Sequence, residues 1–108
     1  MIFRAMGVHI PDRLERRRTE IAQLCERLGV RRLELFGSAG IGANPCDFDF
    51  LVDLGELSPR VYANAYFELL ESLEAMLGNP VDLVTPANLE NPYFRERVEQ
   101  EKTLLYAA

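Results

Sequence analysis

The chain has 108 residues, enough for one domain, 1–108, and too few for a second. An apolar share of 48% is high enough for a hydrophobic core, which excludes a disordered chain. Lys and Arg number 12 against 17 Asp and Glu, and the formal net charge of -5 argues against a general nucleic-acid binder. A core of this size gives modest stability, so a partner subunit or a second copy of the chain could add to it.

Cysteine content and hydropathy bear on the compartment. The two cysteines, Cys25 and Cys46, match neither a disulfide framework nor a metal-binding spacing. No signal peptide is recognisable, and no stretch approaches the roughly 20 apolar residues of a membrane span. With one histidine, His9, a histidine-based site is not expected. The sequence predicts a reduced, cytoplasmic, soluble protein without membrane contact.

The first regular element is a helix predicted over residues 12–28. Apolar residues recur on one face at helical spacing, namely Leu14, Ile21, Leu24, Cys25 and Leu28. Gly29 stands where a left-handed C-terminal cap is needed. A strand over 30–36 follows, and residues 39–46, which are small and interrupted by Asn44-Pro45, predict a loop.

The second predicted strand, residues 47–54, separates its side chains into two sets. Alternate residues lie on opposite faces of a strand. One face carries Phe48, Phe50, Val52 and Leu54 and is a core face; the other carries Asp47, Asp49, Leu51 and Asp53. The alternation therefore places carboxylates side by side on the face away from the core.

The second half of the chain predicts a long helix, a short strand and a short helix. Ser58 as cap and Pro59 in the first turn start a helix that ends at about Leu77. Its apolar stripe comprises Tyr62, Tyr66, Leu69, Leu70, Leu73 and Leu77, and Phe67 is also expected mostly in the core. A strand over 80–84 and a helix over 91–100 follow, and residues 103–106 form a last strand or a tail.

This order of elements predicts an α/β (α+β) fold with a small mixed sheet flanked by helices. The two strands around the loop are expected to be antiparallel. The third strand arrives after a helical crossover, which is typical of a parallel neighbour in the same sheet.

Chemistry-bearing residues gather around the predicted loop. Gly37 lets a backbone approach phosphate closely, and the Ser38 hydroxyl and free amides at such a turn can bind phosphate oxygens. Asp47 and Asp49 project in the same direction, about 7 Å apart along the strand. Hard oxygen ligands at this spacing suit Mg²⁺, which bridges carboxylates to substrate phosphates.

Asp82 is the natural third carboxylate. It stands in a strand otherwise made of Val81, Leu83 and Val84, where a charge needs a partner or a ligand. Like charges repel strongly when close, so several carboxylates on one sheet face indicate a cation or a function. The alternative is that Asp82 belongs to a structural salt bridge.

The combined pattern resembles a known signature. Leu35-Phe36-Gly37-Ser38 followed by Asp47-Phe48-Asp49-Phe50-Leu51-Val52 resembles that of the DNA polymerase beta-like nucleotidyltransferase superfamily. The segment Asn79-Pro80-Val81-Asp82-Leu83-Val84 is similar to the strand of its third carboxylate. The resemblance covers nearly the whole chain and is greatest to the minimal nucleotidyltransferases of bacteria and archaea.

The resemblance implies a role for each site residue. Asp47 and Asp49 would bind two Mg²⁺ ions (Mn²⁺ as a substitute), and Asp82 would ligate the catalytic metal and help activate the attacking hydroxyl. Gly37 and Ser38 would hold the β- and γ-phosphates of ATP. The reaction would be of the EC 2.7.7 type, an in-line transfer of AMP with release of pyrophosphate.

The resemblance also implies a partner. Members commonly pair with a HEPN-domain toxin and act as its antitoxin by transferring AMP to a toxin tyrosine, a type VII-like mechanism. Two alternatives stay open. The loop over 39–46 is shorter than in most members and lacks an arginine many carry after Gly-Ser, so the chain could neutralise its partner by binding alone. An aminoglycoside-type adenylyltransferase is disfavoured because no further domain forms an acceptor pocket.

Overall fold

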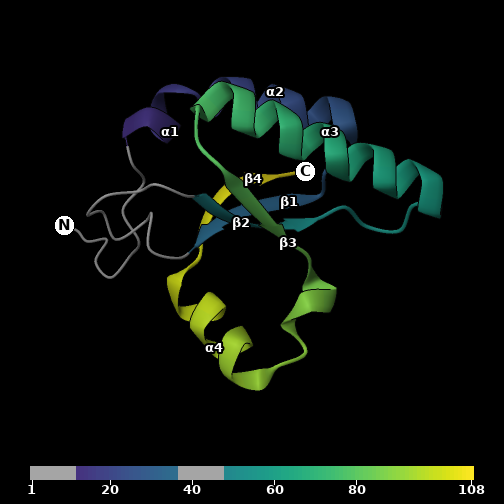
Figure 1. Cartoon of the computed structure of the whole chain (residues 1–108), viewed down its shortest axis with the longest axis vertical. Helices are drawn as coiled ribbons and strands as arrows, with labels where there is room; N and C mark the ends of the chain where they lie inside the picture. The colour runs from purple at the N-terminus through teal and green to yellow at the C-terminus, as the bar shows by residue number, and fades with distance from the viewer. Residues whose placement is uncertain (1–11, 37–47) are drawn as a thin grey trace.

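The computed structural model describes residues 12–36 and 48–108 of the chain (Figure 1). In chain order, its elements are α1 (Asp12–Arg16), α2 (Arg18–Leu28), β1 (Arg32–Phe36), β2 (Phe48–Asp53), α3 (Pro59–Leu77), β3 (Val81–Val84), the 3-10 helix η2 (Pro86–Leu89), α4 (Pro92–Glu101) and β4 (Thr103–Ala107). None of the helices in these ranges is long and apolar enough to cross a membrane.

The four strands form one mixed sheet in the order β3-β2-β1-β4. β1 pairs antiparallel with both β2 and β4, whereas β2 and β3 are parallel and are joined through α3. The predicted mixed sheet, its antiparallel first pair and its helical crossover are thus confirmed. The C-terminal segment, for which the sequence left a strand or a tail open, is a strand that pairs with β1.

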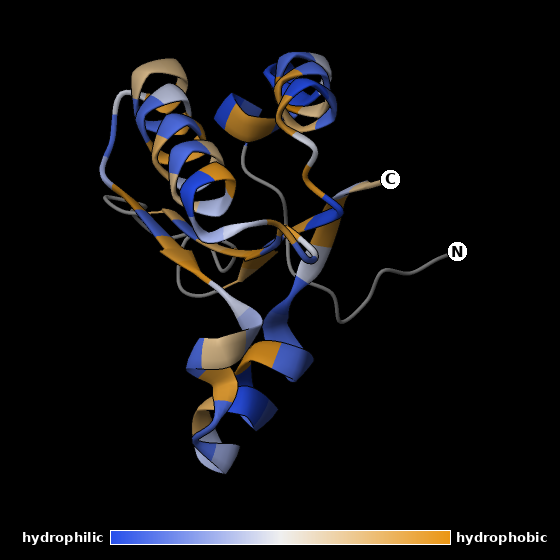
Figure 2. Cartoon of the chain, turned by 90° about the vertical axis from the view of Figure 1, so that its right-hand side faces the viewer, coloured by the Kyte–Doolittle hydropathy of each residue, from blue (hydrophilic) through white to orange (hydrophobic). Residues whose placement is uncertain are grey.

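Helices cover the sheet on two sides. In Figure 1, α2 and α3 lie over one face of the sheet and α4 lies on the opposite side. The main core fills the space under α2 and α3 and includes Leu33, Leu35, Phe48, Phe50, Val52, Leu69, Leu73 and Leu83. A second, smaller cluster lies on the α4 side and consists of Phe36, Leu51, Leu89 and Val98. Figure 2 shows the strands as largely hydrophobic and the helices as mixed.

This two-sided cover explains the burial pattern of the strands. The core face predicted for β2 is confirmed, because Phe48, Phe50, Val52 and Leu54 all belong to the main core. In β1 the four residues after Arg32 are all buried, since Leu33 and Leu35 face the main core while Phe36 faces the smaller cluster. Both faces of the central strands are therefore protected from water.

The predicted helix over 12–28 is divided by a turn at Arg17 into α1 and α2. The Arg17 amide donates to the Leu14 carbonyl at 3.0 Å, a tighter turn than the α-helical one, and the next helix starts from the Arg17 carbonyl. Leu14 and Ile21 are both buried as a result. Gly29 ends α2 with φ 77°, as its position predicts.

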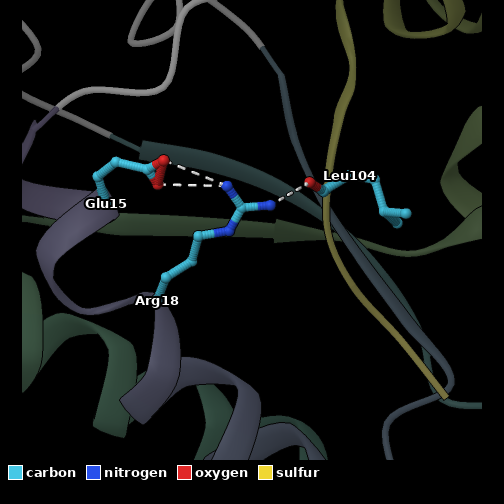
Figure 3. Close-up of polar contacts among 3 residues, drawn as sticks. All are labelled: Glu15, Arg18 and Leu104. Carbon is cyan, nitrogen blue, oxygen red and sulfur yellow. Dashed lines mark hydrogen bonds and ion pairs between the residues drawn. The ribbon is translucent and has the colours of Figure 1, made fainter.

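Arg18 connects the start of α2 to the far edge of the sheet (Figure 3). Its Nη1 atom lies 3.2 and 3.3 Å from the two carboxylate oxygens of Glu15 in α1. Its Nη2 atom donates to the carbonyl oxygen of Leu104 in β4 at 3.3 Å. The Arg18 guanidinium thus links α1, at the start of α2, to the C-terminal strand β4.

The second half of the chain differs from the sequence analysis in two places. Phe67 was expected mostly in the core but is 57% exposed, since it lies off the stripe of Ala65, Leu69, Leu73 and Leu77 that α3 buries; its ring contacts Tyr66 edge-on. The second difference is the helix η2, which lies between the predicted strand over 80–84 and the predicted helix over 91–100. Thr85 and Asn88 form a capping box that starts it.

Candidate active site

Asp49 and Asp82 are opposite each other on neighbouring strands. In the parallel pairing of β2 with β3, Asp49 is the register partner of Asp82. Adjacent strands lie about 4.8 Å apart, and register partners project from the same face of the sheet. The structure therefore brings together two of the three predicted carboxylates on the face that α4 covers.

A cavity of about 200 Å³ opens between this face and α4. Its lining consists of Phe36, Asp49, Asp82, Val84, Phe94, Arg97, Val98 and Glu101. The sheet forms one wall, on which the two aspartates lie with Phe36 and Val84. The opposite wall is α4, which contributes Phe94 and Val98 together with one basic and one acidic side chain.

The two aspartates differ in their surroundings. Asp49 is half-buried and Asp82 is exposed. Within the described residues, Asp82 forms no ion pair with a basic side chain, so the salt-bridge alternative has no partner there. The Asp82 charge contributes to a raised pKa of Tyr66. Burial is the largest cause of that rise, followed by the Asp82 and Tyr62 side chains. The Tyr66 hydroxyl donates to the Leu83 carbonyl at 2.8 Å.

Three predicted site residues, Gly37, Ser38 and Asp47, lie outside the described residues, as does the loop over 39–46. Their roles stay predictions from the sequence. Across 12–36 and 48–108, no group of three or more His, Cys, Asp or Glu side chains could hold a metal ion. The described part contributes the pair Asp49 and Asp82, and a complete metal site needs a further ligand such as Asp47.

Asp53 lies outside this cavity. Its Oδ1 atom accepts a hydrogen bond of 2.8 Å from the Gly55 amide, in the turn that follows β2. Gly55 has φ 71°, a conformation that favours glycine. Asp53 lines a separate groove with Arg31, Tyr62 and Thr85. Its carboxylate therefore stabilises the turn after β2 and does not join Asp49 and Asp82 at the cavity.

Sequence reasoning missed Arg97 and Glu101. Both belong to α4 and line the cavity, and the Arg97 Nε atom lies 3.5 Å from the Glu101 Oε2 atom. Their spacing of four residues was visible and is typical of an ion pair on one helix face. The sequence did not show that this face lies over the aspartates, since that depends on the way α4 packs on the smaller cluster.

Comparison with known proteins agrees with this arrangement. Residues 18–105 match the nucleotidyltransferase domain family. The chain is 41% identical over 71 residues to the protein adenylyltransferase MntA of Thermococcus cleftensis, covering 64% of this chain and 69% of that protein. It superposes on a solved structure assigned as a minimal nucleotidyltransferase with a TM-score of 0.69 and 33% identity, covering 90% of this chain and 98% of the other.

A further solved structure shares the fold at 22% identity and a TM-score of 0.61, covering 87% of this chain and 72% of the other. It contains a tri-AMPylated HEPN toxin of Shewanella oneidensis in complex with an MNT antitoxin. The family match spans both Asp49 and Asp82 and all four strands except the last residues of β4. The chain belongs to the nucleotidyltransferase family and is an enzyme of the minimal nucleotidyltransferase type.

Proposed function

We propose that this protein transfers AMP from ATP to a tyrosine hydroxyl of a HEPN-domain toxin and so acts as its cytoplasmic antitoxin. The observation that carries the proposal is the register pairing of Asp49 with Asp82 at the wall of one cavity. The name of the Thermococcus cleftensis relative and the AMPylated toxin in the Shewanella oneidensis complex support the choice of reaction and of partner.

The donor set fits a magnesium ion. Carboxylate oxygens are the hard ligands that Mg²⁺ prefers, and Asp49 and Asp82 direct two carboxylates to the same cavity. Asp47, two residues before Asp49 on the same predicted face, would complete the set. When bound, Mg²⁺ would neutralise charge on the entering and leaving oxygens of the transfer.

Residues of the chain would accept the proton of the attacking hydroxyl and hold the leaving phosphates. In the transfer, the tyrosine oxygen forms a bond to the α-phosphorus, the bond from that phosphorus to the β-phosphate oxygen breaks, and pyrophosphate leaves. The exposed carboxylate of Asp82 is accessible to an incoming hydroxyl and would accept its proton. Gly37 and Ser38 would hold the β- and γ-phosphates so that the leaving group stays in line.

Intact-mass measurement tests the proposal. The purified protein is incubated with ATP, Mg²⁺ and a candidate HEPN-domain partner protein, and Asp49→Asn serves as the inactive control. We expect the partner to gain mass in whole AMP units with the wild-type protein and to gain none with Asp49→Asn. Peptide mapping then identifies the modified side chain, which we expect to be a tyrosine.

Two other outcomes would replace the proposal. Tight binding of the partner without any gain in mass would show an antitoxin that acts by occlusion, the alternative motivated by the short segment 39–46. A gain in mass of an added aminoglycoside, with none on the partner, would show a small-molecule adenylyltransferase. The second outcome would retain the metal site and change only the acceptor.

A further inference from the structure

The cavity carries charges of both signs on opposite walls. The sheet contributes Asp49 and Asp82, and α4 contributes Arg97 and Glu101. Among the described residues that line it, Arg97 is the one basic side chain. A cation in this position is notable because the chain as a whole has a formal net charge of -5.

Arg97 is held at the cavity by its neighbour. Its side chain is 69% exposed, whereas that of Glu101 is 24% exposed, and the two form an ion pair at 3.5 Å. A pair this open to solvent contributes little to stability. The guanidinium is therefore able to exchange Glu101 for another anion at small cost.

We propose that Arg97 binds the phosphate oxygens of the nucleoside triphosphate, and that Glu101 positions the guanidinium at the cavity until the nucleotide displaces the carboxylate. The inference rests on the proposed function and adds a phosphate-binding residue on α4 to it. A guanidinium presents several donors in a plane and binds phosphate through two parallel hydrogen bonds. The carboxylates of the sheet repel the triphosphate, and Arg97 offsets that repulsion from the opposite wall.

Arg95 provides a matched control on the same helix. It carries the same charge, is also exposed, and is absent from the cavity lining. Replacement of either arginine by glutamine removes one positive charge from α4. A difference between the two variants therefore reports a contact at the cavity and not the net charge of the protein.

The experiment measures the dissociation constant of AMP-PNP with Mg²⁺ by calorimetry for the wild type, Arg97→Gln, Arg97→Lys and Arg95→Gln. We expect Arg97→Gln to weaken binding about tenfold, the typical effect of losing charge-assisted hydrogen bonds. Arg97→Lys should bind AMP-PNP more tightly than Arg97→Gln but more weakly than the wild type, because an ammonium group cannot form two parallel hydrogen bonds to one phosphate. Arg95→Gln should bind as the wild type does, and thermal unfolding checks that all variants are folded.

Glu101→Gln tests the displacement of Glu101 by phosphate separately. If Glu101 competes with phosphate for Arg97, its replacement tightens AMP-PNP binding in the wild type and has no effect when Arg97 is already glutamine. Equal tightening in both backgrounds would show that Glu101 acts only through its own charge, and weaker binding would show that it does not compete; either result would overturn the displacement.

The outcomes separate this inference from the proposed function. Equal affinities for the wild type, Arg97→Gln and Arg95→Gln would overturn the inference and leave nucleotide binding intact. Failure of the wild type to bind AMP-PNP at all would overturn the proposed function and the inference with it. Equal weakening in both arginine variants would assign the effect to general electrostatics and also overturn the inference.

Discussion

Glu34 of β1 and Lys102, at the C-terminal cap of α4, form an ion pair in which Nζ lies 3.6 Å from Oε2. The Glu34 side chain is only 6% exposed, and the Arg32 Nε atom lies 3.3 Å from the same oxygen. Burial makes this carboxylate depend on its cations, because an unpaired charge in a poorly hydrated position is costly. The pair therefore anchors the end of the helix that forms one wall of the cavity.

Replacement of Lys102 by methionine is expected to lower the free energy of unfolding by about 1–2 kcal/mol, measured by urea denaturation. The carboxylate of Glu34 keeps Arg32 and loses its second cation. Arg27→Gln is the control, because the Arg27–Glu68 pair also connects two elements but has side chains 60% and 49% exposed. We expect a loss below about 0.5 kcal/mol there. Equal losses of unfolding free energy in the two variants would refute the idea that burial of Glu34 makes its ion pairs important for stability.

A divalent cation is expected to stabilise the folded protein through Asp49. Mg²⁺ or Mn²⁺ should raise the melting temperature of the wild type, and less so that of Asp49→Asn or of Asp47→Asn/Asp49→Asn, since a ligand that binds only the native state stabilises it. Asp53→Asn should respond as the wild type does, because Asp53 ends β2 outside the cavity and its carboxylate accepts a hydrogen bond from the Gly55 amide. An equal shift in all variants would count against the metal site.

The variant Asp82→Asn is expected to be at least as stable as the wild type when no metal is added. Asp82 lies opposite Asp49 in the β2–β3 register, so its replacement removes a repulsion between two carboxylates. Thermal unfolding in the presence of a chelator measures the difference. A marked fall in the melting temperature would show that Asp82 has a structural partner instead.

The sequence predicted the sheet and its pairing well because the patterns are local. Alternation in residues 47–54 determines which side chains of β2 enter the core, and the structure places all of Phe48, Phe50 and Val52 there. The same alternation sets Asp49 on the other face, and the parallel pairing of β2 with β3 places Asp82 opposite it. The break at Arg17 was not visible, since the apolar spacing of Leu14 and Ile21 fits one continuous helix equally well.

The position of α4 as a wall of the cavity could not be predicted from local sequence patterns. The cavity depends on how Val98 and Phe94 pack against Phe36 of β1, a contact between residues far apart in sequence. Glu34 is likewise buried on this side of the sheet, where it pairs with Lys102 at the C-terminal cap of α4. Arg97 became a site residue only through this packing, which no spacing along the chain encodes.

Alkaline pH is expected to destabilise the protein through Cys25. Burial raises the pKa of this thiol from 9.0 to about 12. Between these values the unfolded chain has lost the proton and the folded protein keeps it, so the free energy of unfolding falls as pH rises above about 9. Below that pH the contribution is fully present. Urea denaturation from pH 8 to 10.5 should show a steeper decline for the wild type than for Cys25→Ala.

The outcome that contradicts this prediction is an equal pH dependence in both proteins. Tyr66, whose pKa is also raised, contributes a decline in the same direction and remains in both. Comparison of the two slopes therefore isolates the thiol, while Cys25→Ala also lowers the baseline by removing a buried sulfur atom.

The unequal size of the two apolar clusters has a consequence for dynamics. The apolar cluster between the sheet and α4 with η2 has only four buried members among the described residues, whereas α2 and α3 share the much larger cluster. Amide hydrogen exchange should accordingly be fastest in α4 and η2, by opening of that layer while the rest stays folded. One wall of the cavity thus belongs to the part of the molecule that unfolds locally at least cost. An occupant that contacts both walls would suppress this opening, and the protection it adds should appear in α4 and not in α3.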